Sequence, residues 1–296
     1  MKKRRLSLVG LALLLGAIIP GTCARAGDLP LPEGVTATPV GERIIHYSFP
    51  SQALKKPMAF TVVLPKGYEA GGPPWPVLFF LHGLGRNENT LIEDPASQAL
   101  LLDQPYVIVL PKGENGWYFD SPFDPSRQFA SYLDEVLALA PQVANISPER
   151  SQRAIGGWSA GGFGSVWACL HHPGSFSTLA TIIAVVDFPA PDVRFPISDK
   201  TFGTDPARWP EFNPLRRAAE LKNLNILLVI GDKASDSVMN EHLSEALTAA
   251  GISNETVHLP GGHTFPTVQG GLSPVLEFVK KHLAPRADVP SPSATK

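Results

Sequence analysis

The sequence predicts an α/β fold with a mostly parallel central sheet, helices on both of its faces and no large cap domain. From the middle of the chain onward, short strand-like runs alternate with helical ones. A serine between two glycines, Ser159, stands directly between a strand candidate and a helix candidate. The chain has 296 residues, of which 44% are hydrophobic and 18% are charged, so it can bury one large core in a single domain.

The first 26 residues are predicted to be a secretory signal outside this fold. Basic residues at positions 2–5 precede an apolar run over 6–19, and Ala24-Arg25-Ala26 offers a small-residue cleavage site. The run is shorter than the roughly 20 apolar residues that span a bilayer, so we expect no stable membrane insertion after cleavage. A membrane anchor and a lipidated Cys23 are the alternatives. We expect a secreted or periplasmic protein with its folded domain over 27–284 and a disordered tail over 285–296.

Charge and cysteine content narrow the class of partner. Cleavage after Ala26 would leave 20 basic against 27 acidic residues, a net charge of about −7. This charge disfavours nucleic acid as a partner. Cys169 would be the only remaining cysteine, so we expect no internal disulfide and a core that holds the fold unaided. These features leave the oligomeric state open.

The N-terminal half is predicted to form short strands, because its apolar runs are rich in β-branched and aromatic residues. These predicted strands cover residues 44–49, 59–64, 77–81 and 106–110. The later strands are predicted at 153–156, 181–186, 225–230 and 255–259. Between 187 and 224, proline-rich stretches are too short for a second domain and are expected to form a small cap or pocket wall.

Helices are predicted between these later strands. One presents an apolar face from Phe129 to Ala140, and another runs from the Ser159 turn to His172. A third runs from about residue 238 and stops at Gly251, a residue suited to the left-handed conformation past a helix end. The last is expected to open at Ser273-Pro274, a cap followed by proline, and to end near residue 283.

The segment Gly157-Trp158-Ser159-Ala160-Gly161 is typical of a nucleophile elbow, in which a strand turns sharply into a helix. Glycines on either side of the serine remove Cβ atoms that would collide in that turn. A serine hydroxyl is a poor nucleophile at neutral pH. It therefore needs a histidine as base, a carboxylate to orient that histidine, and N–H donors for the oxyanion.

His263 is the predicted base, because its glycine-containing loop follows the last predicted strand and could reach Ser159. The other seven histidines lie in or at the ends of predicted regular elements and are expected to be structural. For the carboxylate, Asp236 is favoured and Asp232 is the alternative, since both follow the strand over 225–230. Asp187 is a third candidate.

A glycine turn, His82-Gly83-Leu84-Gly85, follows the buried strand over 77–81 and can present a backbone N–H to an oxyanion. The Ala160 N–H would be the second donor. His82 itself is expected to shape this loop. Trp117 and Tyr118 stand in a polar, glycine-containing loop, and at least one of these rings is expected to line the substrate pocket.

With these motifs placed, the chain from about Ala59 to Leu283 resembles the putative esterase family of the α/β-hydrolase superfamily. That family includes esterase D, S-formylglutathione hydrolase and secreted mycolyltransferases. The motifs that carry the resemblance are Leu81 to Gly85, Trp117-Tyr118 with Ser121-Pro122, Arg153 to Gly164, and Gly261 to Phe265. The resemblance implies an α/β-hydrolase fold, a triad in the order serine, acid, histidine, and oxyanion donors at Leu84 and Ala160.

Two departures from the family pattern matter. The position three residues after the strand-ending glycine, where the family commonly has its acid, is Ala234 here. The acid therefore stays open between Asp236 and Asp232. Trp158 is bulkier than the residue expected before the serine and is expected to narrow or wall the pocket.

These observations predict a carboxylic-ester hydrolase that works through an acyl-enzyme on Ser159. The chemistry needs no cofactor, and no His-x-x-x-His or Cys-x-x-Cys spacing indicates a metal site. The expected partner is a small-molecule or polysaccharide ester. The alternatives are acyl transfer to a sugar or lipid hydroxyl, and a noncatalytic glycan- or lipid-binding protein on the same fold.

Overall fold

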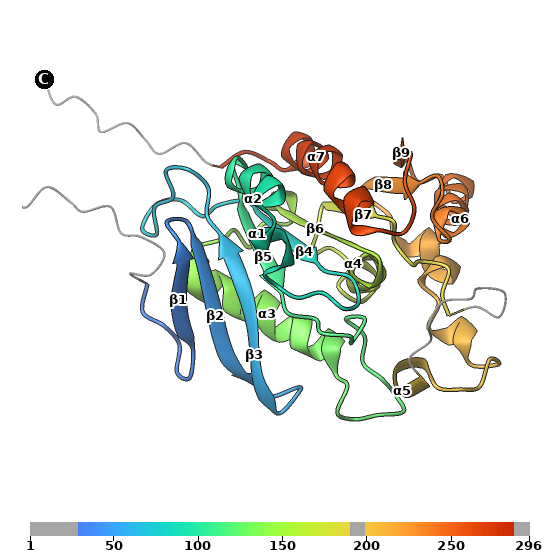
Figure 1. Ribbon diagram of the computed structural model, residues 1–296, viewed down its shortest axis with the longest axis horizontal. Helices are drawn as coiled ribbons and strands as arrows, with labels where there is room; N and C mark the ends of the chain where they lie inside the picture. Colours follow the sequence, from blue (N-terminus) through green and yellow to red (C-terminus); the bar gives the residue numbers. More distant parts are fainter. Residues whose placement is uncertain (1–28, 190–198, 287–296) are drawn as a thin grey trace, which may run out of the picture.

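The computed structural model describes residues 29–189 and 199–286 and contains a nine-stranded sheet (Figure 1). The strands are β1 (Thr36–Gly41), β2 (Ile44–Ser51), β3 (Lys56–Val63), β4 (Val77–Leu81), β5 (Val107–Pro111), β6 (Arg153–Trp158), β7 (Thr178–Ile182), β8 (Asn225–Gly231) and β9 (Glu255–Leu259). Their spatial order is β1-β2-β3-β5-β4-β6-β7-β8-β9. The pairs from β1 to β5 are antiparallel, and every pair from β5 across to β9 is parallel. The predicted α/β fold with a mostly parallel sheet is therefore confirmed.

Helices connect the strands. The α-helices are α1 (Thr90–Glu93), α2 (Pro95–Leu102), α3 (Phe129–Ala144), α4 (Ala160–His171), α5 (Asp199–Phe202), α6 (Ser237–Ala249) and α7 (Phe265–His282). Three short 3₁₀ segments are η2 (Arg150–Gln152), η3 (Trp209–Glu211) and η4 (Pro214–Glu220). Between β7 and β8, the described residues form only α5, η3 and η4, so this part of the connection is small and consists of short helical turns.

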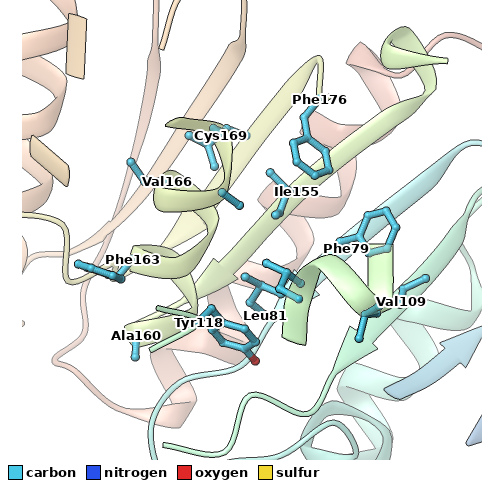
Figure 2. Packing of buried hydrophobic residues seen from close by; sticks show 14 of the residues in the cluster. Phe79, Leu81, Val109, Tyr118, Ile155, Ala160, Phe163, Val166, Cys169 and Phe176 are labelled. Carbon is cyan, nitrogen blue, oxygen red and sulfur yellow. The ribbon is translucent and has the colours of Figure 1, made fainter. Parts of the chain in front are cut away.

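One face of the sheet packs against α3, α4 and α6. Phe79 and Leu81 of β4 point to this side and join a continuous buried cluster with Tyr132, Phe163 and Leu243 from the three helices. Figure 2 shows Phe79, Leu81 and Phe163 within this cluster. Because side chains alternate along a strand, the residues between them must face the other way.

The opposite face packs against α1, α2 and α7. Leu78 and Phe80 of β4 contribute to a second buried cluster, which includes Leu91, Leu101 and Leu272 from those helices. Both faces of the sheet are thus covered by helices, which is why its central strands are apolar throughout rather than alternating. The carboxyl ends of the parallel strands share one edge, and the loops that leave this edge are free to form a site.

Two predicted elements, β7 and α7, differ most from the structure in their bounds. Strand β7 runs over Thr178–Ile182 rather than 181–186, and Ile183 leaves it with a positive φ of 42°. Residues 183–186 are apolar because they are buried in the core, although they do not belong to a strand. The strand prediction followed that apolar run and missed the buried threonine at the start of β7. Strand β1, at the sheet edge and mostly exposed, was not predicted.

Helix α7 begins at Phe265 rather than at Ser273, with Pro266 in its first turn and Pro274 inside it. The prediction took Ser273-Pro274 as a cap followed by proline in the first turn, but Pro274 lies inside the helix. In the structure, a Cβ on Gly271 would lie 2.7 Å from Ile182 Cγ2, so glycine allows α7 to approach β7 closely. The glycine therefore serves helix-to-sheet packing.

The predicted signal over 1–26 and residues 287–296 of the predicted tail lie outside the described residues. Arg286 lies within them, and its guanidinium sits 3.9 Å from the centre of the Trp75 ring. In residues 29–189 and 199–286, none of the helices has the length and apolar character needed to cross a bilayer.

Candidate active site

Ser159 occupies a strained turn between β6 and α4. Its φ of 56° and ψ of −122° lie in a region that non-glycine residues rarely adopt. A Cβ on either flanking glycine, Gly157 or Gly161, would collide with the carbonyl oxygen of Leu81 on the neighbouring strand. The sequence folds as an elbow here because only glycine fits on both sides of the turn.

Three side chains meet at the carboxyl edge of the sheet. Ser159 Oγ lies 2.8 Å from His263 Nε2, and His263 Nδ1 lies 2.5 Å from Asp236 Oδ1. The serine follows β6, the aspartate follows β8 and the histidine follows β9. The Asp236 side chain is fully buried, while a quarter of the His263 side chain is exposed. The structure thus brings the three side chains into one hydrogen-bonded chain.

Asn240 supports the buried carboxylate and was missed by the sequence analysis. Its Nδ2 donates to the Asp236 carbonyl at 2.9 Å and to the Ala184 carbonyl at 2.8 Å, and lies 3.3 Å from Asp236 Oδ2. The available signal was its spacing, because residues four apart on a helix lie on the same face. Asn240 ties the start of α6 to the segment after β7.

The other two candidate acids lie elsewhere. Asp232 is half exposed, and its Oδ1 lies 2.9 Å from His258 Nδ1. Asp187 accepts a hydrogen bond from Asn213 and pairs with His242, on the outer side of α6. Of the three candidates, Asp236 is the one in contact with His263.

The glycine turn after β4 is held by His82, which is almost completely buried. The Gly113 N–H donates to His82 Nε2 at 2.8 Å, so the ring proton resides on Nδ1, which lies 2.8 Å from the Gly83 carbonyl and donates to it. Burial lowers the His82 pKa to about 4, which keeps the ring neutral. The Gly83 carbonyl and the Leu84 N–H belong to one planar peptide group, so this bond also fixes the direction of the Leu84 N–H.

Asn115 braces the same turn from its other side. Its Oδ1 accepts the Gly85 N–H at 2.7 Å, and Gly85 has a φ of 69° that favours glycine. Within the described residues, the Leu84 N–H has no hydrogen-bond acceptor. The Ala160 N–H belongs to the first turn of α4, where N–H groups lack partners within the helix. Two backbone donors are therefore available beside Ser159.

A cavity of about 140 Å³ lies over Ser159 and His263. The residues that line it are Gly83, Leu84, Arg86, Trp158, Ser159, Ile183, His263, Thr264, Phe265 and Val268. Trp158 is in this lining, at the place where the sequence suggested a wall. In the described part of the chain, no group of three or more His, Cys, Asp or Glu side chains could hold a metal ion.

Trp117 and Tyr118 do not line this cavity. Trp117 is 1% exposed and stacks on Phe188, with ring centres 5.0 Å apart. The Tyr118 hydroxyl donates to the Pro111 carbonyl and accepts the His82 N–H, and Figure 2 shows its ring among buried side chains near Leu81. Both rings thus lie in the core, and Tyr118 supports the glycine turn through its hydrogen bond from the His82 N–H.

A family model described as "Putative esterase" matches residues 51–278. The chain is 29% identical to an esterase of Mycobacterium tuberculosis, over 75% of this chain and 56% of that protein. The chain thus spans just over half the length of the curated relatives it matches.

Solved structures share the fold. An S-formylglutathione hydrolase from Agrobacterium tumefaciens superposes with a TM-score of 0.66 and 21% identity, over 84% of this chain and 99% of that one. A fluorophosphonate-binding serine hydrolase of Staphylococcus aureus superposes with a TM-score of 0.70 and 17% identity, over 80% of this chain and 98% of that one. At these identities the likeness establishes a common fold.

Proposed function

Because this chain belongs to the putative esterase family, we propose that it is a serine esterase that hydrolyses carboxylic esters through an acyl-enzyme on Ser159. The observation that carries the proposal is the continuous hydrogen-bonded chain from Ser159 through His263 to the buried Asp236. A hydroxyl, an imidazole and a carboxylate in this order are the components needed to activate a serine. The proposed substrate is a small-molecule or polysaccharide ester.

In the proposed mechanism, Ser159 Oγ attacks the ester carbonyl carbon while His263 Nε2 takes the hydroxyl proton. The Asp236 carboxylate accepts the His263 Nδ1 proton, keeps Nε2 free to act as base and stabilises the imidazolium that forms. The imidazolium then gives its proton to the leaving alcohol. Water attacks the acyl-enzyme by the same route in reverse, which releases the acid and restores Ser159.

The Leu84 and Ala160 N–H groups are the proposed oxyanion donors. The carbonyl oxygen becomes negatively charged only as the tetrahedral intermediate forms, so donors held in place beforehand stabilise that state over bound substrate. His82 and Asn115 support the proposal because their hydrogen bonds to Gly83 and Gly85 leave the Leu84 N–H oriented and available. Loss of one such donor typically costs about 10²–10³ in kcat.

We expect a fluorophosphonate probe to modify Ser159, because the probe captures a serine that an adjacent base has activated. Mass spectrometry of digested protein would locate the adduct on the peptide that contains Ser159. The S159A variant should remain unlabelled. The S165A variant is the matched control, since Ser165 is fully buried further along α4, where its hydroxyl donates to the Gly161 carbonyl, and this variant should label as wild type does. Folded wild-type protein that stays unmodified would contradict the proposal.

We also propose that the esterase is exported and cleaved after Ala26, on the strength of the basic, apolar and small-residue pattern of its first 26 residues. Expression in a bacterial host should give protein outside the cytoplasm whose N-terminal sequence begins at Gly27. The measurement is N-terminal sequencing of each cell fraction. Recovery of only the full-length chain, in the cytoplasm, would contradict export.

A further inference from the structure

The cavity over Ser159 contains one permanently charged side chain. Nine of its ten lining residues are glycine, apolar, hydroxyl-bearing or the titratable His263, and the tenth is Arg86. Arg86 follows the Leu84-Gly85 turn and is exposed to solvent. The whole chain carries a formal net charge of −2, so a lone cation at this position is opposite in sign to the molecule as a whole.

The guanidinium of Arg86 is held in place by an aromatic ring. It lies 4.9 Å from the centre of the Phe265 ring, and Phe265 is the first residue of α7, just after the loop that carries His263. A guanidinium stacked on a ring keeps its N–H donors at the edge, where they remain available to another group. Arg86 therefore spans the cavity mouth between the Leu84 turn and the His263 loop.

Arg86 has no acidic partner among the described residues. In the described chain, the other arginines that lie over aromatic rings each have a hydrogen-bond acceptor, which is a glutamate for Arg208 and Arg217 and a neutral oxygen for Arg127, Arg153 and Arg286. The planar guanidinium matches a carboxylate with two parallel N–H donors. The Arg86 guanidinium beside Ser159 thus has the geometry to bind an anion. No carboxylate of the described chain occupies that position.

We propose that Arg86 forms an anion subsite, and that the preferred substrates are esters that carry a carboxylate on either their acyl or their alcohol part. This inference rests on the proposed esterase function of Ser159. The carboxylate would bind the free edge of the guanidinium while the ester carbonyl lies at Ser159. Because the cavity is small, at about 140 Å³, the charged group stays close to the scissile bond.

Two pairs of esters test the subsite and locate the charge. The acyl pair is mono-para-nitrophenyl adipate, which has a free carboxylate, and methyl para-nitrophenyl adipate, in which that carboxylate is a methyl ester. The alcohol pair is para-acetoxybenzoic acid and its methyl ester. For each pair, kcat/KM of the charged ester is divided by that of the neutral ester, after background hydrolysis is subtracted. We expect this ratio to fall about two- to fivefold in R86Q for at least one pair, a size typical of a charge pair near the surface.

Further measurements separate a binding role from a structural one. R86K should keep most of the ratio, because the positive charge remains. The matched control is R208Q, since Arg208 also lies 4.9 Å from a phenylalanine ring, that of Phe123, but does not line the cavity; its ratio should equal that of wild type. In 1 M salt, where the screening length is about 3 Å, the wild-type ratio should fall while neutral-ester hydrolysis persists.

The outcomes are distinct. A ratio that R86Q leaves unchanged for both pairs would overturn the subsite while the esterase function stands. An equal loss on charged and neutral esters would also overturn it, because Arg86 would then act as a clasp that holds the His263 loop through Phe265. If wild-type protein hydrolyses none of the four esters, the proposed function itself is contradicted. Melting temperatures of the variants establish that each is folded.

Discussion

Replacing Asp236 with asparagine is expected to lower kcat by about 10⁴-fold and to leave the fold intact. The amide keeps the shape of the carboxylate, but its NH₂ can donate to His263 Nδ1. The imidazole would then carry its proton on Nε2, which faces Ser159 and could no longer accept the hydroxyl proton. The measurement is the steady-state rate on a neutral nitrophenyl ester.

Asp232 supplies the matched control for this prediction. It follows the same strand four residues earlier, but its carboxylate lies at the surface on His258. D232N should therefore change kcat little, and D187N should behave in the same way. If D232N lost several orders of magnitude while D236N kept its activity, the assignment of Asp236 as the orienting acid would be wrong.

Replacing Gly161 with alanine is expected to produce the largest loss of stability among conservative changes at the site. A Cβ at this position would collide with the backbone carbonyl carbon and oxygen of Leu81. Backbone cannot rotate away as a flexible side chain can, so α4 must shift from β4. Overpacking of this kind costs about 1–3 kcal/mol or more. Urea denaturation would measure the free energy of unfolding.

Gly270 is the control, because it is also a glycine within a helix. A Cβ there would meet only Leu259 Cδ1 at 3.6 Å, an ordinary van der Waals contact. G270A should therefore stabilise the protein by up to about 1 kcal/mol, the difference in helix propensity between alanine and glycine. Equal unfolding free energies for G161A and wild type would contradict the proposed role of the elbow glycines.

The elbow and the sheet could be predicted from the sequence because their signals are local. Gly157 and Gly161 are required within a few residues of Ser159, and this spacing is visible in the chain itself. The alternation of strand-like and helical runs likewise predicts a sheet that helices cover on both faces. Where a local signal had two meanings, the prediction went wrong: Ser273-Pro274 was taken as the start of the last helix, but the proline of the first turn is Pro266 and Pro274 lies inside α7.

Other features depended on contacts that no local pattern reports. Trp117 and Tyr118 carry the composition of a pocket wall, yet both rings lie in the core. Asn240 looks like an ordinary helix residue until its amide is seen to reach Ala184, 56 positions away in the sequence. Burial and partner choice of this kind arise only when distant segments pack together.

The sequence by itself determined the fold class, the elbow at Ser159 and a histidine loop in the right order along the chain. It left Asp232 and Asp236 open, because both follow the same strand and both suit a turn before a helix. Only the tertiary structure decided which carboxylate meets His263, by burying Asp236 against a residue 27 positions later and leaving Asp232 at the surface. Local sequence sets the backbone conformation, but the neighbours of a side chain depend on how remote strands align at one edge of the sheet.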